Sequence, residues 1–107
     1  MRKLLTLCAT LGALSGLAMA DTWSGTLLDA HCANRHSNEA CYAKRSSSRF
    51  LVDVNGKKYR LDGVTNDNVH SALMNMKRSD VKAGTMVTIT GRMRSNGVIH
   101  GHTVSVQ

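Results

Sequence analysis

Alternation of apolar and polar residues predicts the strands in the first half of the chain. Residues 23–28 alternate in the way that a half-buried strand does. Two further alternating runs, 49–54 and 57–62, flank the dipeptide Asn55-Gly56. Both residues of this dipeptide accept the positive φ of a tight turn, so the runs predict a β-hairpin. The side chains expected to face inward are Trp23, Gly25, Leu27, Phe50, Val52, Val54, Tyr59 and Leu61.

The second half of the chain changes from helical to strand periodicity. Residues 65–78 predict a helix with apolar positions Val69, Ala72, Leu73 and Met76 and candidate N-caps Thr65, Asn66 and Asp67. Residues 86–94 and 98–106 predict a second hairpin around Ser95-Asn96-Gly97, with Val87, Ile89 and Met93 facing inward. Gly91 and Gly101 lie within these strands, where glycine commonly marks a bulge. Without a bulge, His100 and His102 would share a face with Val98, Val104 and Val106.

The order of these elements predicts the fold class. Residues 29–48 have no clean period, and we expect a long loop there with one helical turn near residues 38–44. Five strands with a helix between the third and fourth is the order of the OB-fold, a small Greek-key barrel. An SH3-like barrel is the alternative, but it has no true helix at that point. We therefore expect a mainly β, five-stranded OB-fold-like barrel whose core includes Val52, Leu61, Val87 and Ile89.

The N-terminus has the features of a secretory signal peptide. Arg2 and Lys3 precede an apolar run over residues 4–17, and Ala18-Met19-Ala20 is a cleavage site of small residues. A transmembrane anchor is the alternative, but the run is shorter than the ~20 residues that span a bilayer. We therefore expect a signal peptide over residues 1–20 and a periplasmic or secreted domain over residues 21–107 with no membrane span. Cys8 would leave with the signal peptide.

Two chemical interpretations compete for the segment "DAHCANRHSNEAC", residues 29–41. Cys32 and Cys41 are the two cysteines of the mature chain, and such a pair in an exported protein favours a disulfide. Asp29 would then be a turn or capping residue, with His31 and His36 exposed at the rim. The alternative is a zinc or copper module that uses His31, Cys32, His36 and Cys41 as tetrahedral ligands. The spacing lacks the CxxC knuckle of structural zinc sites, and no cofactor is otherwise expected.

Charge and motifs narrow the class of function. Removing Arg2 and Lys3 from 14 basic residues leaves 12 against 7 acidic ones, a net charge of +5, which favours an anionic partner. Arg49, Lys58 and Arg60 fall on the outward side of the first hairpin and predict an anion-binding face. The chain lacks G-x-S-x-G, HExxH and a glycine-rich phosphate loop, so we expect no enzyme. Nucleic acid is disfavoured as a partner, because Phe50, Tyr59 and Trp23 face inward and leave no aromatic stacking surface.

Several segments together resemble a group of small exported bacterial domains. These segments are "WSGTLLDAHCA" with the histidine and cysteine that follow it, "FLVDVNGKKYRLDG", "AGTMVTITGRM" and the closing "VIHGHTVSVQ". The resemblance spans nearly the whole mature chain, and its most specific part is Asp29-x-x-Cys32 after the tryptophan strand. It implies an OB-fold-like barrel and no particular activity. The group's pattern has a further cysteine shortly after the position of Cys41, where this chain has Arg45, so a three-cysteine site is excluded here.

Overall fold

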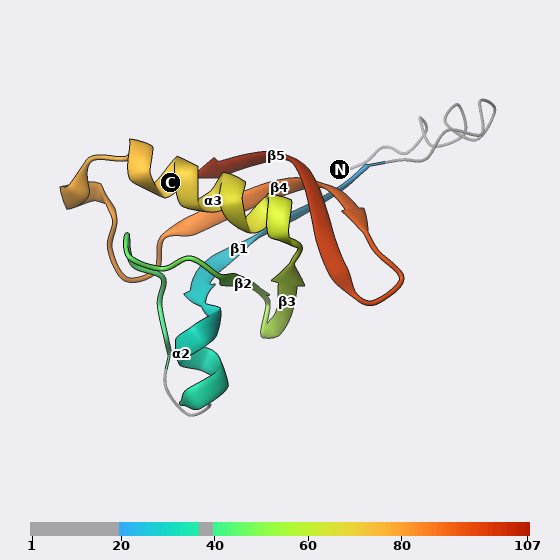
Figure 1. The fold of residues 1–107 in the computed structure, drawn as a ribbon, viewed down its shortest axis with the longest axis horizontal. Coiled ribbons are helices and arrows are strands. Elements are labelled where there is room, and N and C mark those ends of the chain that lie inside the picture. Colours follow the sequence, from blue (N-terminus) through green and yellow to red (C-terminus); the bar gives the residue numbers. More distant parts are fainter. Residues whose placement is uncertain (1–19, 37–39) are drawn as a thin grey trace.

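In the part of the chain that the structure describes, five strands close into a barrel that is accompanied by two α-helices (Figure 1). The computed structural model describes residues 20–36 and 40–107, so the predicted signal peptide lies outside the described residues except for Ala20. The strands are β1 (Asp21–Asp29), β2 (Phe50–Val54), β3 (Lys57–Leu61), β4 (Met86–Met93) and β5 (Val98–Val106). The helices are α2 (Ala30–Arg35), α3 (Gly63–Asn75) and a short 3₁₀ turn, η2 (Arg78–Asp80).

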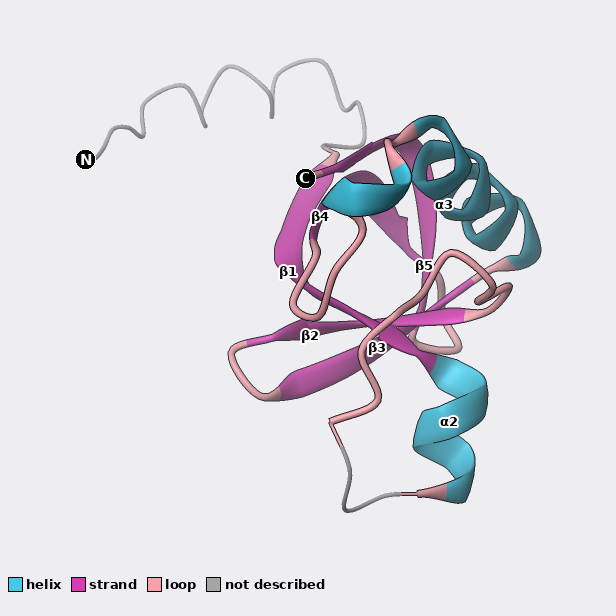
Figure 2. Ribbon diagram, turned by 90° about the vertical axis from the view of Figure 1, so that its left-hand side faces the viewer, coloured by secondary structure: helices cyan, strands magenta, loops and turns pink. Residues whose placement is uncertain are grey.

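The strand order confirms the predicted fold class. Around the barrel the order is β1-β2-β3-β5-β4, and β1 pairs antiparallel with both β2 and β4. The barrel closes through a short parallel contact, in which Arg60 and Leu61 of β3 pair with Val98 and Ile99 of β5. α3 lies between β3 and β4 in the chain and packs against β5, while α2 projects on the other side of the molecule (Figure 2). This is the Greek-key topology of an OB-fold.

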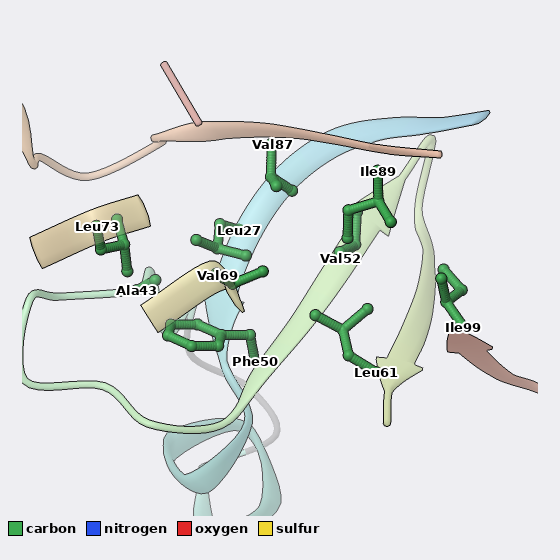
Figure 3. Close-up of a cluster of buried hydrophobic side chains, with 10 residues drawn as sticks. All are labelled: Leu27, Ala43, Phe50, Val52, Leu61, Val69, Leu73, Val87, Ile89 and Ile99. Carbon is green, nitrogen blue, oxygen red and sulfur yellow. The ribbon is translucent and has the colours of Figure 1, made fainter. Parts of the chain in front are cut away.

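The core forms where the inward faces of the strands meet α3 (Figure 3). The four residues predicted to be buried, Val52, Leu61, Val87 and Ile89, are all buried. The other members of the cluster are Leu27, Ala43, Phe50, Val69, Leu73 and Ile99, and Trp23, Val54 and Tyr59 pack against it from partly buried positions. The alternation along β1, β2 and β3 therefore identified the correct faces.

The first hairpin has the predicted turn. Asn55 and Gly56 have φ of 53° and 92°, which are the left-handed values that this dipeptide accepts. The Asp53 carboxylate also accepts a hydrogen bond from the Gly56 N–H at 2.8 Å. The dipeptide and this hydrogen bond both favour the same tight turn, and the turn sets the register between β2 and β3.

Both helix predictions were wrong in their boundaries. The helix in the long connection is α2, Ala30–Arg35, and not a turn near residues 38–44, of which 38 and 39 lie outside the described residues. Asp29 sets this position, because its side chain accepts from the Cys32 N–H and caps the helix directly after β1. The long helix begins earlier than residue 65, because Asp62 is its N-cap and accepts from the Thr65 N–H. It ends at Asn75, before the predicted residue 78.

A bulge in β5 changes which residues face the core. Thr90 pairs with Thr103 and Gly91 pairs with Gly101, so His102 is an extra residue on β5. His102 is accordingly exposed rather than aligned with the valines. A side chain at Gly91 would collide with the His100 carbonyl, which explains the glycine at this crossing. Met93, predicted to face inward, is 38% exposed at the end of β4.

Candidate functional site

An open groove of about 900 Å³ lies between residues 41–46 and residues 78–83. Its apolar lining residues are Tyr42, Ala43, Met74, Val81 and Ala83, together with Cys32 and Cys41. Its charged and polar lining residues are Asp29, Lys44, Arg45, Ser46, Arg78 and Lys82. The groove therefore combines an apolar lining with four cationic side chains, and its volume lies within the range of about 300–1,000 Å³ typical of ligand sites.

The wall formed by residues 41–46 is held against the end of β1. The Cys41 carbonyl accepts from the Asp29 N–H at 2.8 Å, and the Ala43 N–H donates to the Leu27 carbonyl at 3.1 Å. The Cys32–Cys41 disulfide, with Cα atoms 5.5 Å apart, ties the same wall to α2. The predicted disulfide is therefore present, and it borders the groove directly.

The Asp29 side chain also holds the segment that forms this wall, through Ser47. Its carboxylate caps α2 through the Cys32 N–H at 3.0 Å and accepts the Ser47 hydroxyl at 2.6 Å. Burial raises the pKa of this carboxyl, but the hydrogen bonds from Ser47 and Cys32 outweigh that effect, so its pKa is lowered. Asp29 is thus a charged capping residue, as predicted, and each of its carboxylate oxygens accepts one of these hydrogen bonds.

The opposite wall is set by the turn that leads into β4. The buried Thr85 hydroxyl donates to the Lys82 carbonyl at 2.7 Å and lies 3.2 Å from the Lys82 N–H. The Thr85 carbonyl in turn accepts from the Leu27 N–H at 2.9 Å. These bonds fix the backbone of the turn while the Lys82 side chain stays exposed at the groove.

The charges around the groove are not neutralised within the described part of the chain. None of Lys44, Arg45, Arg78 and Lys82 forms a salt bridge there with a carboxylate. Arg45 is oriented by Met74, because its Nη2 donates to the Met74 carbonyl at 3.2 Å. Four cationic side chains and one carboxylate, Asp29, line the groove, so it presents an excess of positive charge to solvent.

The four residues of the predicted metal module do not form a ligand set. Both sulfurs of Cys32 and Cys41 are used in the disulfide, so neither provides the thiolate that zinc binds. His31 and His36 are exposed on and next to α2. Over residues 20–36 and 40–107 no group of three or more His, Cys, Asp or Glu side chains is placed to hold a metal ion.

The predicted anion-binding face of Arg49, Lys58 and Arg60 stays a prediction. Arg49 and Arg60 border a hollow of about 200 Å³ that Asn34, Leu51 and Asn66 also line. Lys58 is absent from that lining and lies opposite Asp53 in the β2–β3 ladder. All three cations are exposed as predicted, and Lys58 lies in β3 two residues before Arg60.

A polar cluster at the start of α3 was not predicted. The Asp62 carboxylate accepts from the Thr65 N–H and hydroxyl, at 2.9 and 2.6 Å, and from Nδ1 of His100 and Nη1 of Arg94. Burial raises the pKa of Asp62, but the hydrogen bonds from Thr65 and His100 lower it more, to about 2. Asp is a favoured N-cap residue and Asp62 comes just before the helical pattern, but the alternating pattern of residues 57–62 assigned it to the strand.

The groove cations were also missed as a group. Lys44-Arg45 and Lys77-Arg78 are two dibasic pairs far apart in the sequence, and only the folded chain brings members of both to one groove.

In the described part of the chain no helix is long and apolar enough to cross a membrane. Comparison of the chain with protein-family models, curated proteins and solved structures finds no match.

Proposed function

We propose that this chain is an exported, non-enzymatic binding domain whose groove receives an anionic ligand with an apolar part. The observation that carries the proposal is the groove itself, where four cations without carboxylate partners among the described residues surround an apolar lining. A purely anionic ligand would not use Tyr42 and Met74, which line the groove while 42% and 48% exposed. An uncharged ligand would leave the cations unused. An amphiphilic anion satisfies both.

The arrangement of titratable groups supports binding rather than catalysis. Asp29 is the one carboxyl among the groove residues, and it is committed to the cap of α2 and to Ser47. The Asp62–His100 pair lies outside the groove lining. Its hydroxyl neighbour Thr65 is buried and donates to Asp62, so it is not a nucleophile activated by the histidine.

The disulfide supports the proposal of export. Disulfides persist in oxidising compartments such as the periplasm and the extracellular space. The Cys32–Cys41 bond fits such a compartment, and the features of residues 1–20 provide the route to it. An oxidising compartment also keeps the wall of the groove tied to α2.

Anilinonaphthalene sulfonate is a suitable probe, because it joins an anionic group to aromatic rings and its fluorescence increases in apolar sites. We expect saturable binding to the folded protein that weakens as salt is added, since the cations are exposed and screened. Replacing Lys44, Arg78 and Lys82 by Ser removes three groove charges. Each exposed charge contributes about 0.2–1 kcal/mol, so the affinity should fall by about threefold or more.

The matched control removes the same charge from the hairpin face. The triple substitution of Arg49, Lys58 and Arg60 by Ser should leave the dissociation constant nearly unchanged. If this variant loses binding and the groove variant keeps it, the anion site is the face predicted from the sequence and the groove proposal is wrong. If neither variant changes the affinity, the positive charge only solvates the surface. Circular dichroism of both variants confirms that the barrel is intact.

A further inference from the structure

We infer that the occupant of the groove is an extended acidic peptide segment of a partner protein, which adds as a strand to residues 41–43. The inference rests on the proposed function, because it uses the same groove and the same cations. It goes further by naming the class of partner and the way the partner binds. Two independent observations carry it, an unpaired backbone edge and the distribution of charge on the two walls.

The unpaired edge follows from the hydrogen bonds that residues 41–43 make. Tyr42 lies opposite Leu28 in an antiparallel bridge, and the bonds to β1 are made by the Cys41 carbonyl and the Ala43 N–H. Cys41 has a left-handed φ of 51°, so the direction of the Tyr42 groups follows from the planar trans peptides on either side of Tyr42, in which the carbonyl of one residue and the N–H of the next point in opposite directions. The N–H and carbonyl of Tyr42 therefore point away from β1, and neither has a hydrogen-bond partner among the residues that the structure describes.

The position of this edge leaves room for another strand. β4 pairs with β1 from Gly91 to Met86, and the last pair on that side is Thr26 with Met86. At the next residue of β1, the Leu27 N–H donates to the Thr85 carbonyl and the Leu27 carbonyl accepts from the Ala43 N–H. Beyond the end of β4, residues 41–43 are therefore the neighbour of β1 on this side. Across the groove lie residues 78–83, which form no backbone hydrogen bond with residues 41–43. The groove thus lies beside the free backbone edge at Tyr42, and a free backbone edge is the feature that β-strand addition uses.

The side chains around the edge specify an acidic peptide. Lys44 and Arg45 stand on the wall next to the edge, and Arg78 and Lys82 stand on the opposite wall. Side chains of an added strand alternate between its two faces. A strand of alternating acidic and apolar residues would place its carboxylates near the cations and its apolar residues on the groove lining, which includes Tyr42. A lipid or a small anion would match the charge but would leave the Tyr42 backbone unpaired.

The test uses a short peptide of alternating Glu and Val, fluorescein-labelled, with the purified disulfide-bonded protein. Two matched peptides carry N-methyl groups, one on every Glu amide and the other on every Val amide. Only one of these sets faces the Tyr42 edge, so one peptide should lose at least about fivefold in affinity while the other loses much less. A peptide of alternating Lys and Val should not bind, and exchange of the Tyr42 amide proton should slow when the acidic peptide is added.

The outcomes separate this inference from the proposed function. If anilinonaphthalene sulfonate binds in the groove but both N-methylated peptides bind as well as the unmodified one, strand addition is wrong and the anion-binding groove stands. If neither the sulfonate probe nor the acidic peptide binds, both proposals fall. If vesicles of phosphatidylglycerol bind through the groove cations and the acidic peptide does not compete, the occupant is a membrane surface and the peptide inference is overturned.

Discussion

Replacing both Cys32 and Cys41 by Ser should destabilise the protein by about 2.7 kcal/mol. The bond joins residues that are nine apart, and closing a ring of about ten residues removes that much conformational entropy from the unfolded chain. Both side chains are only half-buried, so the serines add little further cost. We expect the wall to keep its two backbone hydrogen bonds to β1 in the variant, because neither bond involves a cysteine side chain. The destabilisation should therefore come mainly from the higher conformational entropy of the unfolded chain without the disulfide.

Urea unfolding followed by circular dichroism measures this change. The variant should show a lower midpoint, and its melting temperature should fall by about 10–20 °C, since 1 kcal/mol corresponds to about 4–8 °C in a domain of this size. The wild type in dithiothreitol should behave as the variant does, whereas the variant itself should not respond to the reductant. A loss below about 1 kcal/mol would show that the bond does not restrict the unfolded chain in the way that the entropic model requires.

Three further predictions test the core, the acid limb of stability and the metal alternative. Ile89→Ala should cost about 2–5 kcal/mol in urea unfolding because the side chain is fully buried, whereas a loss below half a kcal/mol would mean the strand faces are misassigned. Asp62 has a pKa lowered to about 2, so its stabilisation is complete above about pH 4 and is lost as the pH falls toward 2. The wild type should therefore lose stability between pH 5 and pH 2, and Asp62→Asn should make this loss smaller by about 1–2 kcal/mol, after allowance for solvent screening. The control Asp67→Asn, on the exposed face of α3, should show the same loss as the wild type. A chelator should not change the melting temperature of the oxidised protein, since the disulfide leaves no thiolate for a metal, and a lower melting temperature would restore the metal module.

The parts of the fold that depend on local pattern could be predicted from the sequence. Alternation identified the inward faces of β1 to β3, and Asn55-Gly56 fixed the first turn, because both signals act over a few neighbouring residues. The glycines within the last two strands indicated a bulge, and β5 has one extra residue, His102, which reverses the alternation beyond it. Such a bulge depends on the close crossing of Gly91 and Gly101, which lie in different strands.

Of the candidate site, the disulfide and the helix cap beside it could be predicted from the sequence, but the groove could not. The cysteine pair and the capping role of Asp29 follow from nearby residues and were predicted correctly. The groove requires residues 41–46 and 78–83 to meet, and no local pattern brings these segments together. The predicted cationic face rested on strand alternation alone, which shows that Arg49, Lys58 and Arg60 point outward but not what else lies beside them.

The connection between β1 and β2 links the stability of this protein to its proposed binding. β1 and β2 are antiparallel neighbours, and such strands need only a short turn, yet residues 30–49 separate them here. Of the described residues in that connection, only Ala43 belongs to the buried apolar cluster. The connection is nevertheless fixed by the disulfide, by Asp29 with Ser47, and by two backbone bonds to β1. Ordering a loop this firmly costs conformational entropy and adds little to the core. What the fixed segment gains is a defined position for the Tyr42 edge and for Lys44 and Arg45, which is the preorganisation that a binding groove requires.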